Sequence, residues 1–192
     1  MSFLKEILET NDLVNARYRE SKIPRFIQSF IIKHYKRKLI KIINKMNPEY
    51  MPADAIYDFA LAVISKYPEG KYDNIKVNYI DNSSSIMFSI EVPIVMDNII
   101  DATIYIDIMK QKDDNYYLKI KVKSWTNSAP NSMYDTSFTR YQALSLEACN
   151  EFFNAGFYTE FRVNIFKAML NELYNTMKKF LLDEVNTKGL LL

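Results

Sequence analysis

The stretch "IKVNYIDNSSSIMFSIEV", residues 75–92, decides the fold class. Apolar residues alternate with polar ones on both sides of the segment "DNSS", whose composition favours a turn. An alternation with a period of two predicts two β-strands, each with its apolar side chains on one face. Pairing residue 75 with 90, 77 with 88 and 79 with 86 brings these apolar side chains together. We therefore predict an antiparallel hairpin here.

A second hairpin is predicted about "KQKDDN", residues 110–115. In the expected register, apolar residues of the two strands face each other: Ile104 and Val122, Ile106 and Ile120, Ile108 and Leu118. On the other face, Asp107 lies opposite Lys119 and Thr103 opposite Lys123. A register that suits both faces is well specified. The two hairpins predict a four-stranded antiparallel meander with one packed face and one solvated face.

Helices are predicted on both sides of the meander. Residues 3–20 have a helical pattern that we expect to break near Asn11, since Thr10, Asn11 and Asp12 are good N-caps. Proline suits a first helical position, and Pro24 and Pro52 are expected to begin the helices 24–46 and 52–67, the second burying Ile56, Phe59, Ala60 and Val63. After the sheet come two more predicted helices, 138–154, stopped by Gly156, and 159–185.

The order of helices, meander and helices predicts one α+β domain over residues 1–192, with helices on one face of the sheet. Glycine occurs only three times, so the clustered glycines of phosphate-binding loops are absent from the sequence. One cysteine permits no internal disulfide, and a net charge of +2 does not indicate a dedicated nucleic-acid binder. The start "MSFLKEILETND" is unlike a signal peptide. The sequence contains no run of 18 apolar residues, so we expect no membrane-spanning helix and no membrane partner.

We expect no catalytic, cofactor or metal site. The single His34 and Cys149 lie in different predicted helices, and both are interpreted as structural. Asp101 and Asp107 share the polar face of the third strand, as acids do in some metal-dependent nucleases. The fourth strand, "YLKIKVKSW", adds lysines and no acid. Cross-strand ion pairs on a solvated face therefore explain these carboxylates.

The strongest charge feature is "KHYKRKLIKIINK", residues 33–45. At 100° per residue, Lys33, Arg37 and Lys41 fall on one side of a helix and apolar residues on the other. Three interpretations stay open for the basic side: a solvated face, a contact with an acidic protein, or a contact with phosphate groups of nucleic acid or membrane.

Two apolar segments suggest contacts outside a single core. Phe26, Ile27 and Phe30 lie on the side of the helix that becomes basic one turn later, so the helix start is apolar nearly all round and is expected to be buried on several sides. The chain ends in "NTKGLLL", where Gly189 allows a turn and Leu190, Leu191 and Leu192 follow. These leucines either fold back onto their own core or enter the groove of a neighbour. We favour the neighbour, because "NTK" spaces them from the helix.

The helical start "SFLKEILETNDLVNARYRES", the meander 73–125, the helix 159–185 and the tail "KGLLL" together resemble bacteriophage neck or head–tail connector subunits in layout. The resemblance implies a non-enzymatic virion protein that forms a homo-oligomeric ring and binds a portal or tail protein. It also implies a helical arm over 1–23, a C-terminal hook over 186–192, and no cofactor or small molecule. Partner contacts are then expected at Phe26, Ile27, Phe30, Lys33, Arg37, Lys41, Leu190, Leu191 and Leu192.

Two alternatives remain from the residues alone. One is a small nucleic-acid-binding or regulatory protein, cytoplasmic rather than viral, that uses the basic helix 33–45 and binds less tightly as salt rises. The other is an enzyme with a pocket between the sheet and the helices.

Overall fold

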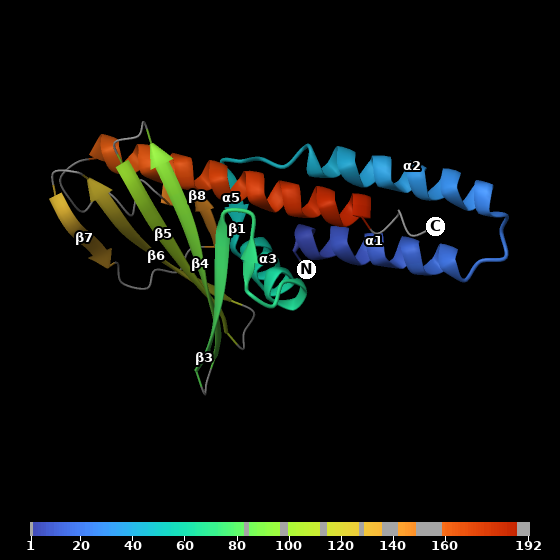
Figure 1. Cartoon of the computed structure of the whole chain (residues 1–192), viewed down its shortest axis with the longest axis horizontal. Coiled ribbons are helices and arrows are strands. Elements are labelled where there is room, and N and C mark those ends of the chain that lie inside the picture. The colour runs from blue at the N-terminus through green and yellow to red at the C-terminus, as the bar shows by residue number, and fades with distance from the viewer. Residues whose placement is uncertain are drawn as a thin grey trace. The chain divides into compact units, whose positions relative to one another are not determined.

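The computed structural model describes residues 2–82, 85–96, 100–111, 115–126, 129–135, 142–148 and 159–187. The fold is α+β, as predicted, with the elements in the order shown in Figure 1. The helices are α1 (Phe3–Arg19), α2 (Arg25–Ile43), α3 (Ala53–Lys66) and α5 (Thr159–Thr187). The strands are β1 (Tyr50–Pro52), β2 (Lys71–Tyr72), β3 (Ile75–Asn82), β4 (Ser85–Met96), β5 (Ile100–Lys110), β6 (Tyr116–Thr126), β7 (Ala129–Asp135) and β8 (Ala143–Ser145).

The chain divides into two compact units. Unit 1 comprises Met1–Asn47 and Met177–Leu192, and unit 2 comprises Pro48–Thr176. Helix α5 contributes its residues up to Thr176 to unit 2 and its remaining residues to unit 1. None of the helices in the described part of the chain is both long enough and apolar enough to cross a bilayer.

The main sheet of unit 2 is an antiparallel meander in the order β2-β3-β4-β5-β6-β7. Its four central strands are the four predicted ones, and β2 and β7 extend it at either edge. The register predicted for β5 and β6 is confirmed on both faces. Asp107 pairs with Lys119, Thr103 with Lys123, and the three apolar pairs lie opposite each other as expected.

The register predicted for the first hairpin was wrong by two residues. Val77 pairs with Ile90 and Tyr79 with Phe88, and the pairing continues to Asn82 and Ser85. Side chains alternate with a period of two, so a shift of two residues keeps every apolar side chain on its face. The apolar pattern therefore could not distinguish the two registers.

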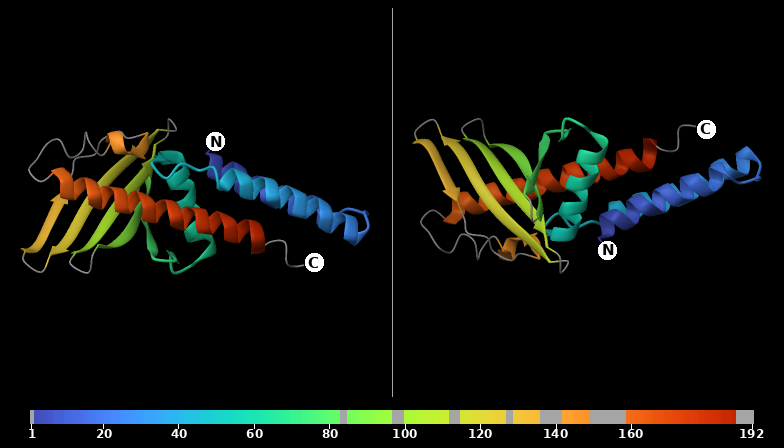
Figure 2. Two further views of the ribbon diagram at one scale, coloured as in Figure 1. Left: turned by 90° about the horizontal axis from the view of Figure 1, so that it is seen from above. Right: turned by 90° about the horizontal axis from the view of Figure 1, so that it is seen from below.

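One face of this sheet forms the core of unit 2, with α3 and the first part of α5 against it (Figure 2). The side chains of Ile90, Ile104 and Ile106 on that face are fully buried. From α3, Tyr57 places its ring 5.1 Å from the ring of Phe88 and 5.5 Å from that of Tyr116. The predicted buried face of α3 is confirmed: Ile56, Phe59, Ala60 and Val63 are each 0% exposed.

The helix predicted over 138–154 was wrong at residues 143–145. These residues form β8, which pairs with β1 through Met51 and Leu144, both buried. The backbone N–H of Ala53 also donates to the carbonyl of Gln142 at 2.9 Å. Residues 143–145 are extended because they pair with β1, about 90 positions earlier in the chain. The local periodicity of residues 138–154 gives no information about so distant a partner. Residues 146–148 are helical, and Gly156 lies outside the described residues.

Unit 1 consists of α1, α2 and the end of α5. Leu4, Ile43 and Phe180, one from each helix, are 0% exposed. The break predicted near Asn11 was wrong, because α1 is continuous over 17 residues. Asn11 does not cap a helix: it is 2% exposed, and its Nδ2 donates to the backbone carbonyl of Glu184 in α5 at 3.1 Å.

The two prolines lie at the starts of their helices, but as N-caps, one position before the first helical residue, and not as the first helical residue that was predicted. Pro24 is the N-cap of α2, and its carbonyl accepts from the N–H groups of Ile27 and Gln28. Pro52 is the N-cap of α3. At α1 the N-cap is Ser2, whose side-chain oxygen accepts from the N–H of Lys5 at 3.2 Å.

Candidate protein-binding surface

The connection between α1 and α2 is held by the side chain of Gln28, which sequence analysis missed. Its Nε2 donates to the carbonyl of Ile23 at 2.6 Å and to that of Ser21 at 3.1 Å. The N–H of Ile23 in turn donates to the hydroxyl oxygen of Ser21 at 3.1 Å. Gln28 is only 6% exposed. Helices α1 and α2 form a helical hairpin. Because the amide of Gln28 satisfies the carbonyls of its turn, this end of the α1–α2 hairpin has a defined conformation.

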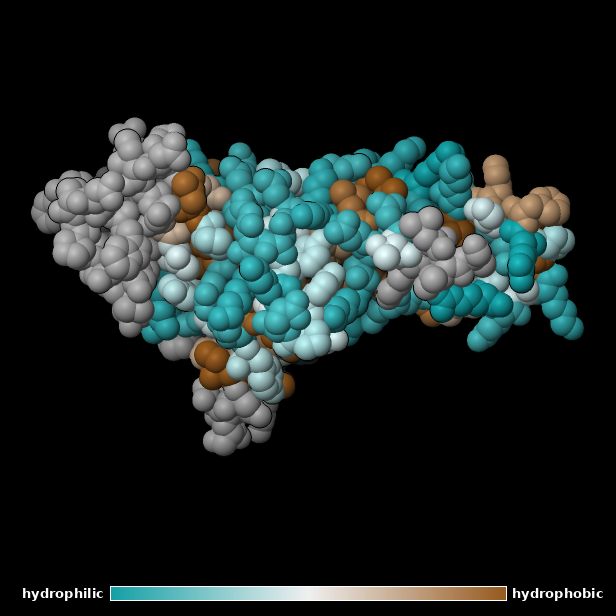
Figure 3. All heavy atoms as spheres, in the orientation of Figure 1, coloured by the Kyte–Doolittle hydropathy of each residue, from teal (hydrophilic) through white to brown (hydrophobic). Residues whose placement is uncertain are grey.

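This end of the hairpin carries an exposed apolar surface, which we call the tip: Ile23, Phe26, Ile27 and Phe30. Phe26 and Phe30 are each 75% exposed. Gln28 and Ile32 face the interior of unit 1, so residues two positions from Gln28 point outwards. Figure 3 shows apolar side chains among hydrophilic ones where α1 and α2 join. The burial expected for this helix start does not occur within the single chain.

Basic side chains continue the outer face of α2 beyond the tip. Lys33, Arg37 and Lys41 are all exposed. Over residues 13–45 the sequence has ten Lys and Arg and only one acid, Glu20. The tip is therefore an apolar surface within a strongly positive region.

Lys36 differs from its basic neighbours. Its Nζ donates to the backbone carbonyl of Asn186 at 3.3 Å, close to the end of α5. Partial burial lowers the pKa of its amine. A cation near the C-terminal end of a helix interacts favourably with the carbonyls there. Lys36 therefore belongs to the packing of unit 1 more than to its outer surface.

The two units differ in charge. Unit 1 has 14 basic and 6 acidic residues, whereas unit 2 has 11 basic and 17 acidic residues. The small net charge of the whole chain conceals this asymmetry. It gives unit 1 a surface that attracts acidic partners and gives unit 2 the opposite preference.

The leucine tail lies outside the described residues. Helix α5 is described to Thr187, whose hydroxyl donates to the carbonyl of Asp183 at 2.6 Å. Leu190, Leu191 and Leu192 follow, so the structure places neither their side chains nor the hook expected over 186–192 as a whole.

The polar face of the sheet is less solvated than predicted at Asp107, which is only 4% exposed. Its Oδ1 accepts from the hydroxyl of Ser89 at 2.6 Å, and its Oδ2 lies 2.9 Å from Nζ of Lys121. Lys119 is its register partner, but the ion pair is formed with Lys121, which lies diagonally opposite on β6. The apolar stems of long side chains can cover a carboxylate on a sheet face, which period-two alternation does not reveal.

The other residues considered as chemical sites are not brought together. His34 is exposed and meets the ring of Tyr35 edge-on, with 6.2 Å between ring centroids. Cys149 and the side chain of Asp101 lie outside the described residues. Within the described part of the chain, no three His, Cys, Asp or Glu side chains are arranged to hold a metal ion.

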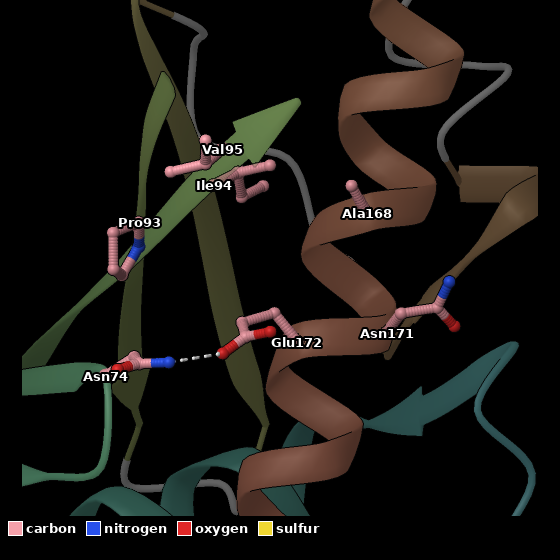
Figure 4. Close-up of a pocket in the computed structure, with 7 residues that line it drawn as sticks. All are labelled: Asn74, Pro93, Ile94, Val95, Ala168, Asn171 and Glu172. Atoms are coloured by element: carbon pink, nitrogen blue, oxygen red, sulfur yellow. Dashed lines mark hydrogen bonds between the residues drawn. The ribbon is translucent and has the colours of Figure 1, made fainter. Parts of the chain in front are cut away.

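Unit 2 contains an open groove of about 560 Å³ between β4 and α5. Its lining is mostly apolar on the strand side and polar on the helix side: Asn74, Pro93, Ile94, Val95, Ala168, Asn171 and Glu172. Figure 4 shows Glu172 pointing from α5 towards Asn74, whose Nδ2 donates to its Oε1 at 3.2 Å. Val95 is 68% exposed. The groove thus presents aliphatic surface beside one carboxylate.

No family model, curated protein or solved structure matches this chain.

Proposed function

We propose that this protein is a non-enzymatic assembly subunit that uses the tip of its α1–α2 hairpin to bind protein and forms a cyclic homo-oligomer. The exposure of Phe26 and Phe30, 75% each, carries the proposal. Single exposed apolar residues are ordinary, but a contiguous exposed group on a rigid helical end is typical of a protein contact. Aromatic residues and arginine are enriched at such interfaces, and Arg25 adjoins Phe26 in the sequence.

The virion as the setting rests on layout alone. The helical start, the antiparallel meander and the long last helix of this chain resemble bacteriophage neck or head–tail connector subunits in layout. In this setting the tip would bind a neighbouring subunit or a portal or tail protein.

The test of the tip is the self-association of the purified chain, measured by light scattering over a range of concentrations. Phe26→Gln with Phe30→Gln should weaken self-association at least about tenfold, as truncation of interface aromatics does. Ile42→Gln is the matched control, since Ile42 is 48% exposed at the other end of the same helix. It should assemble as the wild type does. A double variant that assembles like the wild type, or a wild type that stays monomeric, contradicts the proposal.

A second candidate function is the binding of nucleic acid. It is favoured by the excess of basic residues over 13–45, where ten Lys and Arg occur with a single acid, Glu20. It predicts an affinity for DNA or RNA that falls steeply as salt rises, because binding releases counterions from the phosphates. Changing Lys33, Arg37 and Lys41 together to Gln should then abolish binding while the helical circular dichroism is retained. Salt-insensitive or absent binding by the wild type rejects this candidate.

A further inference from the structure

We infer that the groove between β4 and α5 in unit 2 is the acceptor for the tip of a second copy of this chain. The inference rests on the proposed function and adds the identity of the partner surface. The occupant is thus defined: Phe26 and Phe30 of one copy enter the groove of the next copy, with Arg25 beside Glu172.

The first argument is the exposed edge of β4. Its pairing with β3 extends from Ser85 to Glu91, so among the described strands residues 93–95 pair with β5 alone. Pro93, which has no N–H to donate, and Val95 are exposed, while Ile94 is buried as the floor of the groove. A proline on an open strand edge disfavours the addition of another strand there. The groove therefore suits apolar side chains better than an added β-strand.

The second argument is size and spacing. A groove of about 560 Å³ is larger than one aromatic side chain needs and lies in the usual range of binding pockets. Phe26 and Phe30 are four residues apart on α2, so they project from one side of the helix about one turn apart. On the groove wall, Ala168 and Glu172 have the same spacing on α5. An amphipathic helix end that places anchors at i and i+4 into a groove is a recurrent mode of recognition.

The third argument is charge. The tip belongs to the unit with 14 basic and 6 acidic residues, and the groove to the unit with 11 basic and 17 acidic residues. Two tips would repel each other, as would two grooves. Contacts of tip with groove join unlike charges. They use different surfaces on the two copies, so the arrangement is head-to-tail and closes into a ring where the rotation permits.

The test mixes two variants that are each defective on one side. The tip variant is Phe26→Gln with Phe30→Gln, and the groove variant is Val95→Arg. Val95 is exposed, so arginine there is compatible with folding; its length and charge obstruct an entering basic tip. Ala168→Arg, on the helix side of the groove, is the second groove variant. Because it leaves β4 unchanged, it shows whether an effect of Val95→Arg comes from the groove or from a local distortion of β4. Leu61→Gln, an exposed position on α3, is the control.

Each variant alone should self-associate at least about tenfold more weakly than the wild type. An equimolar mixture should form dimers of one copy of each and no larger species, because the tip variant keeps its groove and the groove variant keeps its tip. Sedimentation velocity distinguishes these species. The assembly of the Glu172→Gln variant should depend less on salt concentration than the assembly of the wild type does.

Four outcomes overturn the inference. If both groove variants assemble like the wild type while the tip variant does not, the tip binds elsewhere and the proposed function stands. If each variant is monomeric alone and their mixture also stays monomeric, the tip of one copy does not enter the groove of another. If the tip variant instead assembles normally, the proposed function itself fails. Binding of the wild type to anionic vesicles without self-association would assign the tip to a membrane surface and reject the groove as its acceptor.

Discussion

The Nδ2 atom of Asn11 lies 3.1 Å from the backbone carbonyl oxygen of Glu184, to which it donates a hydrogen bond across unit 1. Asn15 donates to Oδ1 of the same side chain at 3.4 Å. Asn11, where the sequence predicted a helix break, therefore forms a buried polar link from α1 to α5, and Asn15 supports its side chain. A buried amide with all its partners specifies one packing of the helices.

Replacing this amide tests the link. Asn11→Asp preserves size but cannot donate to the carbonyl of Glu184, and it should lower the free energy of unfolding by about 1–3 kcal/mol. Asn11→Ala should cost a similar amount. Leu13→Ala, at a position 70% exposed on the same helix, should stay within about 0.5 kcal/mol of wild type. Urea unfolding followed by helical circular dichroism measures all three, and a wild-type midpoint for Asn11→Asp would contradict the role of the link.

The buried carboxylate of the sheet gives a second prediction. From the sequence, Asp107→Asn should cost almost nothing, as expected for an exposed ion pair. Since Asp107 is 4% exposed and accepts from Ser89, we now expect Asp107→Ala to cost about 2–3 kcal/mol. Asp107→Asn should cost less, because its amide oxygen can still accept from Ser89 and Lys121 can turn towards solvent. If Asp107→Ala and the wild type are equally stable in urea, Asp107 contributes no more than a solvent-exposed ion pair, as the sequence predicted.

The turn that follows α3 gives a third prediction. Gly70 has a φ of +66°, and a Cβ on it would run into the backbone carbonyl oxygen of Val77, while the N–H of Val77 donates to the carbonyl of Gly70 at 2.6 Å. Gly70→Ala should therefore cost more than about 2 kcal/mol, as a strained conformation combined with a clash does. The nearby Asp73 also has a positive φ, of 54°. Asp73→Gly should stay within about 1 kcal/mol of wild type, and thermal unfolding of the two variants should separate them.

A fourth prediction concerns alkaline pH. Burial raises the pKa of Tyr57 above its ordinary value of 10.0, Asp58 adds to the rise, and Lys110 opposes it. Above pH 10 the unfolded chain therefore loses this proton before the folded chain does, so stability falls as pH rises through that range. Tyr57→Phe should reduce the fall, measured as the change in urea midpoint between pH 9 and pH 11. Tyr35→Phe, at an exposed position, should keep the wild-type fall.

The sequence by itself determined what depends on neighbours along the chain or on one face of an element. Period-two alternation located β3 to β6, and complementary pairs on both faces fixed the register of β5 and β6. Pro24 and Pro52 marked the starts of α2 and α3, because a fixed φ acts locally. Helical periodicity also placed Phe26, Phe30 and the basic residues of α2 on one side of the helix, but it predicted burial of the two phenylalanines, which are 75% exposed.

Only the tertiary structure decided what depends on partners far away in sequence. The pairing of β1 with β8 makes a strand of residues 143–145, the carbonyl of Glu184 makes Asn11 a core residue, and the groove joins β4 to α5. A shift of two residues leaves a strand's faces unchanged, so the register of β3 and β4 was also decided by the folded chain. The physical reason is the same in each case: periodicity shows which side of an element is buried, whereas long-range contacts decide what covers it.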